Sequence, residues 1–246
     1  MTMIIGHRGG RDLWPENSLH GFEQLKALGV EGVEFDVHLT RAGELLVIHD
    51  ALLERTTDRS GPVADLAPGE NRGIRLKNSS DLYIPTLAEV LEVYADTTLE
   101  LHVELKADAA GTPYEGLEER TVEELRRHGL AGQCMVTSFG ERILHRLAQV
   151  APEIPRLASL NHDHAEKLGG LEAALTRLSG LAEVIAIEKT LMRDASDTIR
   201  AMLPPERLGV WVPNTGDELR YWQAQPLRQL TTDRPDRAVA IRQETQ

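Results

Sequence analysis

A chain of 246 residues, 41% of them hydrophobic, has the length and core content of a single (β/α)8 barrel or another one-domain α/β fold. Its 39 acidic and 27 basic residues give a net charge of −12, which argues against nucleic acid as a partner, because phosphate backbones need clustered Lys and Arg. Aromatic residues make up only 4%, so a platform for stacked bases is also disfavoured.

The N-terminal sequence MTMIIGHRGG has no charged segment followed by a long apolar one. No apolar run approaches the roughly 18 residues of a membrane span. We therefore expect a soluble, cytoplasmic protein without stable membrane insertion. The single cysteine, Cys134, excludes an internal disulfide and a multi-cysteine zinc site, and we interpret it as a small apolar residue of a strand.

Short apolar runs predict strands along the whole chain, at residues 3–6, 32–39, 45–49, 99–106, 134–139, 156–160, 183–188, 207–212 and 228–232. Helical patterns lie between them, near residues 18–28, 86–95, 115–128, 141–150, 164–178, 193–203, 216–224 and 235–243. In the first of these helices Leu19, Phe22 and Leu25 recur at close to helical spacing, and Asn17 or Ser18 would cap it.

This alternation predicts a parallel sheet with right-handed crossovers. If residues 45–49 extend the preceding strand as a hairpin, eight βα units remain, and that number favours a closed (β/α)8 TIM barrel. We expect one domain over residues 1–246. Residues 51–83 lack helical periodicity and are rich in Gly, Asp, Arg and Ser, so we interpret them as a small inserted segment or lid. A surface loop without a role is the alternative.

The strand at 32–39 carries two acids on one face. Residues two apart in a strand point the same way, so Glu34 and Asp36 lie together, while Val33, Phe35 and Val37 belong to an apolar row on the other face. Adjacent carboxylates repel unless a cation or a shared proton intervenes. The pair therefore indicates a metal site more than a stabilising feature.

A third acid, Glu104, would join this pair, because the ends of barrel strands converge at one face. Glu34, Asp36 and Glu104 would form an all-oxygen site for one divalent cation, which suits Mg²⁺, Ca²⁺ or Mn²⁺ better than zinc. The alternative is a core in which the acids pair with Lys106 and Arg8. Three acids against two cations would still leave buried negative charge.

His7 and His49 end predicted strands and are the candidates for proton transfer. Imidazole titrates near neutrality, so one ring could take a proton from a nucleophile while the other gives a proton to a departing oxygen. Such a pair beside a metal suits hydrolysis of a phosphate ester, although the residues do not decide which is the acid. His102 lies deeper in its strand, and we interpret it as a core residue or a support for the site.

Arg8 and Lys106 would place positive charge beside the metal, where a guanidinium fits phosphate oxygens in a forked geometry. Gly9 and Gly10 would let the backbone approach a ligand closely. The chain contains no Walker sequence and no GxGxxG, so a nucleotide cofactor has no support.

Four blocks of sequence resemble the motifs of glycerophosphodiester phosphodiesterases, in the same order. They are HRGGRDLWPENS (7–18), EGVEFDVHLTRAGELLVIHDALLERTTDRSG (31–61), HVELK (102–106) and TTDRP (231–235). The resemblance implies a TIM barrel that uses a divalent cation to hydrolyse glycerophosphodiesters to sn-glycerol 3-phosphate and an alcohol, with residues 51–83 as the family's small insertion.

The resemblance also implies roles for individual residues. These are Glu34, Asp36 and Glu104 as metal ligands, His7 and His49 as the acid–base pair, Arg8 and Lys106 as phosphate contacts, and Trp211 as an aromatic of the pocket. Two departures are visible. PENS replaces the commoner PENT, and WVPN replaces W-T-x-N, which puts Pro213, a residue without a backbone donor, at a strand end.

Two rival hypotheses remain. A lysophospholipase D-like enzyme on the same barrel, acting on lysophospholipids or sphingomyelin, would share the metal and the histidines but need an apolar trough for the acyl chain. The low aromatic content argues against it. A catalytically inactive barrel that binds a phosphorylated ligand or partner would have no need of all three acids and both histidines.

Overall fold

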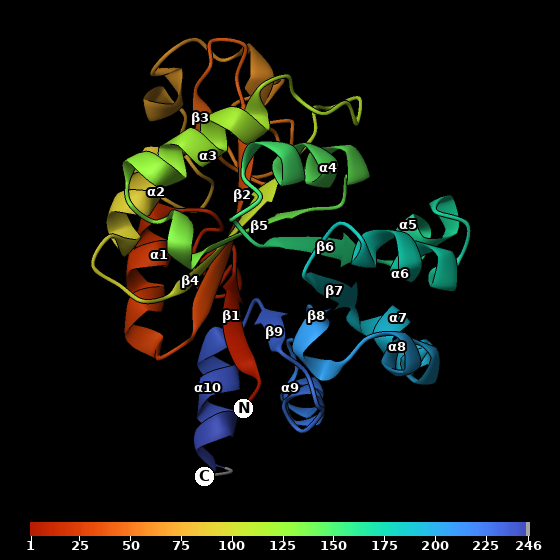
Figure 1. Cartoon of the computed structure of the whole chain (residues 1–246). Helices are drawn as coiled ribbons and strands as arrows, with labels where there is room; N and C mark the ends of the chain where they lie inside the picture. The colour runs from red at the N-terminus through yellow and green to blue at the C-terminus, as the bar shows by residue number, and fades with distance from the viewer. Residues whose placement is uncertain (245–246) are drawn as a thin grey trace.

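The computed structural model describes residues 1–244, in which helices surround a central set of strands (Figure 1). The strands are β1 Met3–His7, β2 Gly32–Leu39, β3 Leu45–Val47, β4 Glu100–Leu105, β5 Cys134–Ser138, β6 Arg156–Leu160, β7 Val184–Glu188, β8 Leu208–Trp211 and β9 Gln229–Thr232. The α-helices are α1 Leu19–Leu25, α2 Leu87–Tyr94, α3 Leu117–Arg127, α4 Glu141–Val150, α5 His162–Lys167, α6 Leu171–Ser179, α7 Lys189–Asp194, α8 Ser196–Met202, α9 Gly216–Gln223 and α10 Pro235–Glu244.

The sheet closes into a barrel. Strands β1, β9, β8, β7, β6, β5, β4 and β2 pair in that order, and β1 also pairs with β2, with Ile5 opposite Gly32 and His7 opposite Glu34. All of these pairings are parallel. β3 is antiparallel to β2, as expected for a hairpin extension. The prediction of a (β/α)8 barrel is therefore confirmed.

The apolar row of β2 packs outward against the helices. Val33, Phe35 and Val37 belong to the main core cluster, which fills the layer between strands and helices. Phe22 of α1 meets the ring of Phe35 edge-on, with ring centroids 5.7 Å apart. Burying a side chain of this size contributes roughly 1.5–3 kcal/mol, so the outer face of β2 stabilises the barrel while its inner face is left for polar residues.

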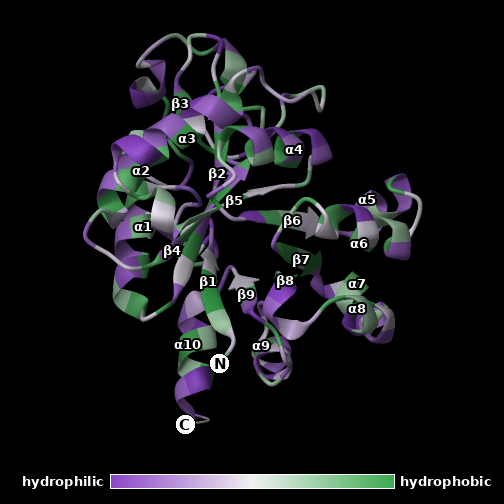
Figure 2. Cartoon of the chain, viewed as in Figure 1, coloured by the Kyte–Doolittle hydropathy of each residue, from purple (hydrophilic) through white to green (hydrophobic). Residues whose placement is uncertain are grey.

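Hydropathy follows the same division between inside and outside. In Figure 2 the surface helix α3 is mostly hydrophilic, whereas β7 in the barrel wall is hydrophobic. Cys134 is a free, buried residue at the start of β5 and belongs to the main core cluster. Burial raises the pKa of its thiol to about 12, so it packs as a small apolar side chain.

Residues 51–83 lie between β3 and α2, at the top of Figure 1. Their helical content is two short 3₁₀ turns, Val63–Asp65 and Glu70–Gly73. A small apolar cluster separate from the barrel core joins the segment to its flanks. Leu53, Val63, Leu66, Ile74 and Leu76 belong to the segment, and Leu46, Ile48 and Ile84 flank it. The segment is thus held in place by apolar packing against the end of the β2–β3 hairpin.

Two predicted helices were wrong in their extent. The helix expected at 164–178 is divided into α5 and α6, because Gly169 and Gly170 both adopt positive φ, at 94° and 98°, where a helix cannot continue. The helix expected at 193–203 is likewise two helices, and the first begins at Lys189, directly after β7. Asn17 and Ser18 were both possible caps, and the Ser18 hydroxyl accepts from the Gly21 N–H at 3.0 Å.

No helix within residues 1–244 is both long enough and apolar enough to span a bilayer.

Candidate active site

The predicted site residues meet at the carboxyl ends of the barrel strands. A cavity of about 300 Å³ opens there. Its lining includes His7, Arg8, Glu34, His49, Glu104, Lys106 and Trp211. The eighth predicted residue, Asp36, lies behind this lining and is only 1% exposed. Segments far apart in the sequence are therefore brought to one place by barrel closure.

Three carboxylates form the centre of the site. Glu34, Asp36 and Glu104 are all buried or nearly so, and each offers an oxygen within 4.8 Å of the oxygens of the other two. The register explains this, because Asp36 of β2 pairs directly with Glu104 of β4, and both side chains point into the barrel. The arrangement has the shape of a site for one cation.

Two cations partly neutralise this cluster. The Lys106 ammonium lies 2.8 Å from Asp36 and 2.5 Å from Glu104, and Arg8 Nε lies 3.4 Å from Asp36. Burial alone would raise the pKa of Asp36, but Lys106 and Arg8 outweigh it and hold that pKa well below its usual range. Burial would likewise lower the pKa of Lys106, yet Asp36 and Glu104 raise it overall. The ion pairing with Lys106 and Arg8 that was the alternative to a metal site is therefore present for Asp36 and Glu104.

Glu34 is the acid of the three that is not in an ion pair with Lys106 or Arg8. Its Oε2 accepts the backbone N–H of Arg8 at 3.1 Å, but its Oε1 is buried without a hydrogen-bond partner. Burial, followed by the charges of Asp36 and Glu104, raises the pKa of Glu34 well above its usual range. A divalent cation would satisfy this oxygen and offset the charge, so the residues present fit such an ion.

Asn17, from the PENS motif, supports the acidic cluster and was not identified as a site residue in the sequence. Its Nδ2 donates to Asp36 Oδ2 at 2.8 Å. The backbone of Asn17 has φ of 54°, and Arg8 has φ of 51°, both in the left-handed region that costs energy for a residue with a side chain. The loop after β1 is thus held in a strained form that aims both residues at Asp36.

His7 is fixed by an acid from the other end of the chain. Its Nδ1 lies 2.5 Å from Asp233 Oδ1, and Asp233 Oδ2 accepts from Asn214 Nδ2 at 2.7 Å. A carboxylate only accepts, so Nδ1 is the donor, and Nε2 is the nitrogen left for chemistry. Asp233 lies in the TTDRP motif at the end of the last predicted strand, and no role was assigned to it from the sequence.

His49 is held in the same way by its neighbour. Its Nδ1 lies 2.6 Å from Asp50 Oδ1. Arg55 then binds Asp50 through Nε at 2.5 Å and Glu16 through two nitrogens at 2.8 Å each. Glu16 in turn accepts from Arg8 at 3.1 Å. Arg55 therefore connects residues 51–83 to both His49 and the loop after β1.

His38 supports His49 through the backbone. Its Nε2 donates to the His49 carbonyl at 3.0 Å, and its Nδ1 accepts from the Tyr114 hydroxyl at 2.8 Å. Burial lowers the pKa of His38 to about 4, so it remains neutral at physiological pH and keeps this pattern of hydrogen bonds. His102 is 1% exposed, is hydrogen-bonded to Glu100 at 2.6 Å and lies in the cavity floor, which agrees with a supporting position.

The far wall of the cavity is apolar. Trp211 donates its indole N–H to the Ala186 carbonyl at 3.0 Å and meets Phe139 edge-on. Leu157 completes this wall. The carbonyl of Pro213 accepts from the Thr232 hydroxyl at 2.7 Å, so the unusual WVPN sequence is built into the strand ends.

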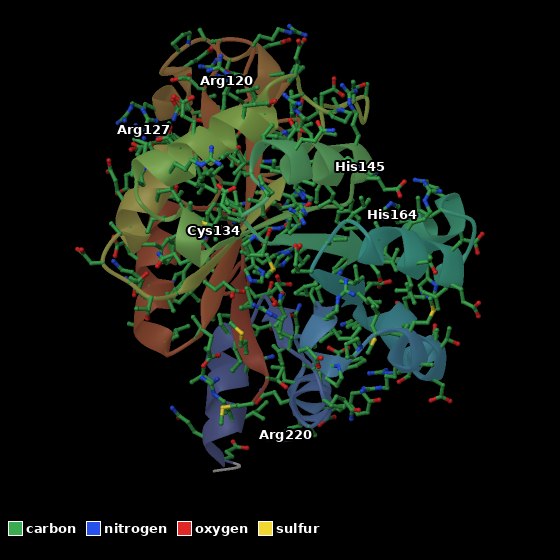
Figure 3. The ribbon with its side chains drawn as sticks, in the orientation of Figure 1. Arg120, Arg127, Cys134, His145, His164 and Arg220 are labelled. Atoms are coloured by element: carbon green, nitrogen blue, oxygen red, sulfur yellow. The ribbon has the colours of Figure 1, made fainter. Side chains whose placement is uncertain are left out.

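Figure 3 shows His145 and His164 on the outer helices α4 and α5.

Residues 7–237 match the glycerophosphoryl diester phosphodiesterase family. The chain belongs to this family. The resemblance inferred from the four sequence blocks is thereby confirmed. The match covers the described site from His7 on β1 to Asp233 after β9.

Individual relatives agree with this family assignment. A glycerophosphodiester phosphodiesterase from Caldanaerobacter subterraneus subsp. tengcongensis is 32% identical over 158 residues, which are 62% of this chain and 64% of the relative. The chain thus spans just under two thirds of that relative's length.

Solved structures match over nearly the whole chain. One from Agrobacterium tumefaciens, provisionally named a glycerophosphoryl diester phosphodiesterase, has a TM-score of 0.88 and 28% identity, with 100% of this chain and 98% of the other covered. A phosphodiesterase from Oleispira antarctica, solved in complex with the product sn-glycerol-3-phosphate, has a TM-score of 0.82 and 26% identity, with 99% and 97% covered.

Proposed function

We propose that the protein hydrolyses glycerophosphodiesters to sn-glycerol 3-phosphate and an alcohol with the help of one divalent cation. The observation that carries this proposal is the meeting of three carboxylates with His7 and His49 around one cavity. Family membership supports the reaction class, and the O. antarctica relative with its bound product supports the identity of the phosphate product.

Glu34, Asp36 and Glu104 would hold the cation, and Mg²⁺, Ca²⁺ and Mn²⁺ all suit this oxygen set. When bound, such an ion offsets the charge of a phosphate and lowers the pKa of an oxygen attached to it. The strongest support is the buried Oε1 of Glu34, which has no hydrogen-bond partner from the protein.

His7 and His49 would exchange protons with the substrate through Nε2. Because each Nδ1 donates to a carboxylate, each neutral ring presents an Nε2 that accepts a proton, and each protonated ring is stabilised by Asp233 or Asp50. One histidine would take a proton from the nucleophile, which is either water or the neighbouring glycerol hydroxyl. The other would protonate the departing alcohol oxygen.

The remaining lining would position the substrate. Arg8 and Lys106 border the cavity with positive charge and would face the phosphate, while Trp211 would provide an apolar wall for the carbon skeleton. We propose that the barrel is one catalytic domain and that residues 51–83 form an inserted segment beside the cavity mouth, where Arg55 binds Asp50.

Release of glycerol 3-phosphate from a glycerophosphodiester, measured with chelator and then with each cation restored, tests this function. We expect turnover only with a divalent cation. His7→Ala and His49→Ala should each lower kcat by about 10²–10⁴-fold, the range for loss of a general acid or base.

His145→Ala provides the matched control, because His145 is an exposed histidine of α4 outside the cavity (Figure 3). It should leave kcat unchanged. Near-normal turnover by the His7→Ala His49→Ala double variant would end the assignment of the two histidines. No turnover by the wild type on any phosphodiester would favour the catalytically inactive barrel.

The apolar wall at Phe139, Leu157 and Trp211 is the observation that favours the lysophospholipase D-like rival, because an acyl chain needs such a surface. Lysophosphatidylcholine and glycerophosphocholine share the choline group and differ in the acyl chain. We expect faster release of choline from glycerophosphocholine, and the opposite order would favour the rival.

A further inference from the structure

A second cavity, of about 480 Å³, adjoins the catalytic one. One side is the loop after β1, residues 11–16, and the other is formed by residues 55–56 and 76–78 of the inserted segment. Arg11 lines both cavities, so the second opens beside the first. A phosphodiester has two alcohol arms, and the catalytic cavity of about 300 Å³ would hold the phosphate and the glycerol arm.

The boundary between the cavities is a fixed ion-pair network. Glu16 is bound on one side by Arg8, at 3.1 Å, and on the other by Arg55, through two contacts of 2.8 Å. These charges satisfy one another, so they define the shape of the boundary and leave ligand binding to other groups. Arg55 also connects this boundary to His49 through Asp50.

The other two cations of the second cavity, Lys77 and Arg11, are paired weakly or not at all with acids. Within residues 1–244, the Lys77 ammonium contacts the Glu54 carbonyl at 2.5 Å and has no carboxylate in salt-bridge range. Arg11 Nε is 3.8 Å from Asp233 and 4.0 Å from Glu16, beyond hydrogen-bond length.

Two further polar residues, Thr56 and Asp12, line this cavity. Thr56 Oγ1 is buried without a hydrogen-bond partner. The one remaining acid of the lining, Asp12, has Arg234 nearby to offset its charge. In a chain of net charge −12, a cavity lined by Lys77, which is unpaired among the described acids, and a loosely paired Arg11 is suited to an anion.

We propose that the second cavity binds the departing alcohol arm of the substrate and that Lys77 and Arg11 select an arm carrying a negatively charged group, a phosphate or a carboxylate. This inference rests on the proposed phosphodiesterase function. It assigns substrate selectivity to the inserted segment, which supplies Lys77, and leaves the bond-breaking groups in the barrel. A cationic arm such as choline would meet like charge there.

The test compares kcat/KM for three glycerophosphodiesters at low ionic strength. Bis(glycerophospho)glycerol has an anionic arm, glycerophosphoglycerol has a neutral arm and glycerophosphocholine has a cationic arm. We expect the wild type to prefer the anionic arm. Lys77→Gln should lower the ratio of kcat/KM for the anionic arm over the neutral arm about fivefold to tenfold, the loss of one charge-assisted contact.

Lys167→Gln is the matched control, because Lys167 is an exposed lysine of α5 and its loss changes the net charge equally. It should leave the ratio unchanged. A ratio that Lys77→Gln does not alter, an equal loss on all three substrates, or a wild-type preference for the choline arm would each overturn the proposal while the phosphodiesterase function stands. Absence of turnover on all three substrates would instead contradict the proposed function.

Discussion

The two histidines of the site have acidic partners in different surroundings. Asp233 has a side chain only 7% exposed and receives a second hydrogen bond from Asn214. Asp50 is 28% exposed and is held by Arg55. Burial opposes ionisation of Asp233, but hydrogen bonds from His7 and Asn214 lower its pKa overall. Asp233 is therefore a buried carboxylate with a lowered pKa, which suits it to position His7.

Asp233→Asn should lower kcat by about 10²–10⁴-fold, because a neutral amide neither favours the Nδ1–H form of His7 nor stabilises the protonated ring. KM should change little, since Asp233 does not line the cavity. The measurement is steady-state release of glycerol 3-phosphate. Asp96→Asn, in an exposed turn after α2, is the control. A kcat within threefold of the wild type would show that Asp233 does not orient His7.

The contact between His7 and Asp233 also shows which part of the site the sequence could not reveal. Glu34 and Asp36 could be placed on one face because a strand has a period of two, and that prediction depends only on neighbours in the chain. His7 and Asp233 are separated by 226 positions, and they meet only because β1 pairs with β9. No local pattern contains that contact, so the sequence did not reveal Asp233 as the partner of His7.

At the scale of elements, strand ends were predicted well and helix interruptions poorly. β2 and β6 have the predicted bounds, because each apolar run ends at residues that favour turns or helix starts. The break between α5 and α6 depends on Gly169 and Gly170. A Gly-Gly pair is itself a turn signal, so the sequence contained a sign of this break that the prediction of one continuous helix passed over.

Glu100, at the start of β4, joins His102 of the cavity floor to Arg228, the residue before β9. Glu100 lies 2.6 Å from His102 and 2.7 Å from Arg228. Burial would raise the pKa of Glu100, but these two partners outweigh it and lower the pKa to about 2. The folded state therefore binds a proton at Glu100 less readily than the unfolded chain does, and the group stabilises the fold wherever it is ionised.

Glu100→Gln should reduce the free energy of unfolding by about 1–3 kcal/mol at pH 7. Because the folded pKa lies below the unfolded one, this difference is complete above about pH 5 and declines as the pH falls toward 3. Urea unfolding at pH 7, 5 and 3.5 measures it. Glu206→Gln, an exposed acid after α8, is the control. A difference that stays constant over this pH range would contradict the assigned pKa.

At the scale of the whole molecule, the acids of the site lower the stability of the fold that brings them together. Barrel closure brings β1, β2 and β4 together, and with them three acids that repel one another. Lys106 and Arg8 neutralise two of these, while the third remains buried and incompletely hydrogen-bonded. A protein that binds a cation at this place loses stability without the ion and regains it when the ion binds.

Glu34→Gln should therefore separate stability from metal binding. With chelator present, the variant should melt about 2–4 °C above the wild type, because the substitution removes a repelled charge and keeps an acceptor for the Arg8 N–H. A divalent cation at 100 times its Kd should stabilise the wild type by about 2.7 kcal/mol, which raises its Tm by about 5–10 °C. The variant should gain far less, because one ligand is missing.

Calorimetry with chelator, Mg²⁺, Ca²⁺ and Mn²⁺ on the wild type, Glu34→Gln and Glu206→Gln distinguishes the outcomes. Glu206→Gln changes the net charge equally but lies outside the carboxylate cluster, so it should keep the full response to the cation. A Glu34→Gln protein that melts below the wild type in chelator would mean that Glu34 is a stabilising partner of Arg8 and Lys106. An unchanged response to all three cations would remove Glu34 from the ligand set. A larger Tm shift with one cation would identify the ion that the barrel binds most tightly, since the shift depends on concentration relative to Kd.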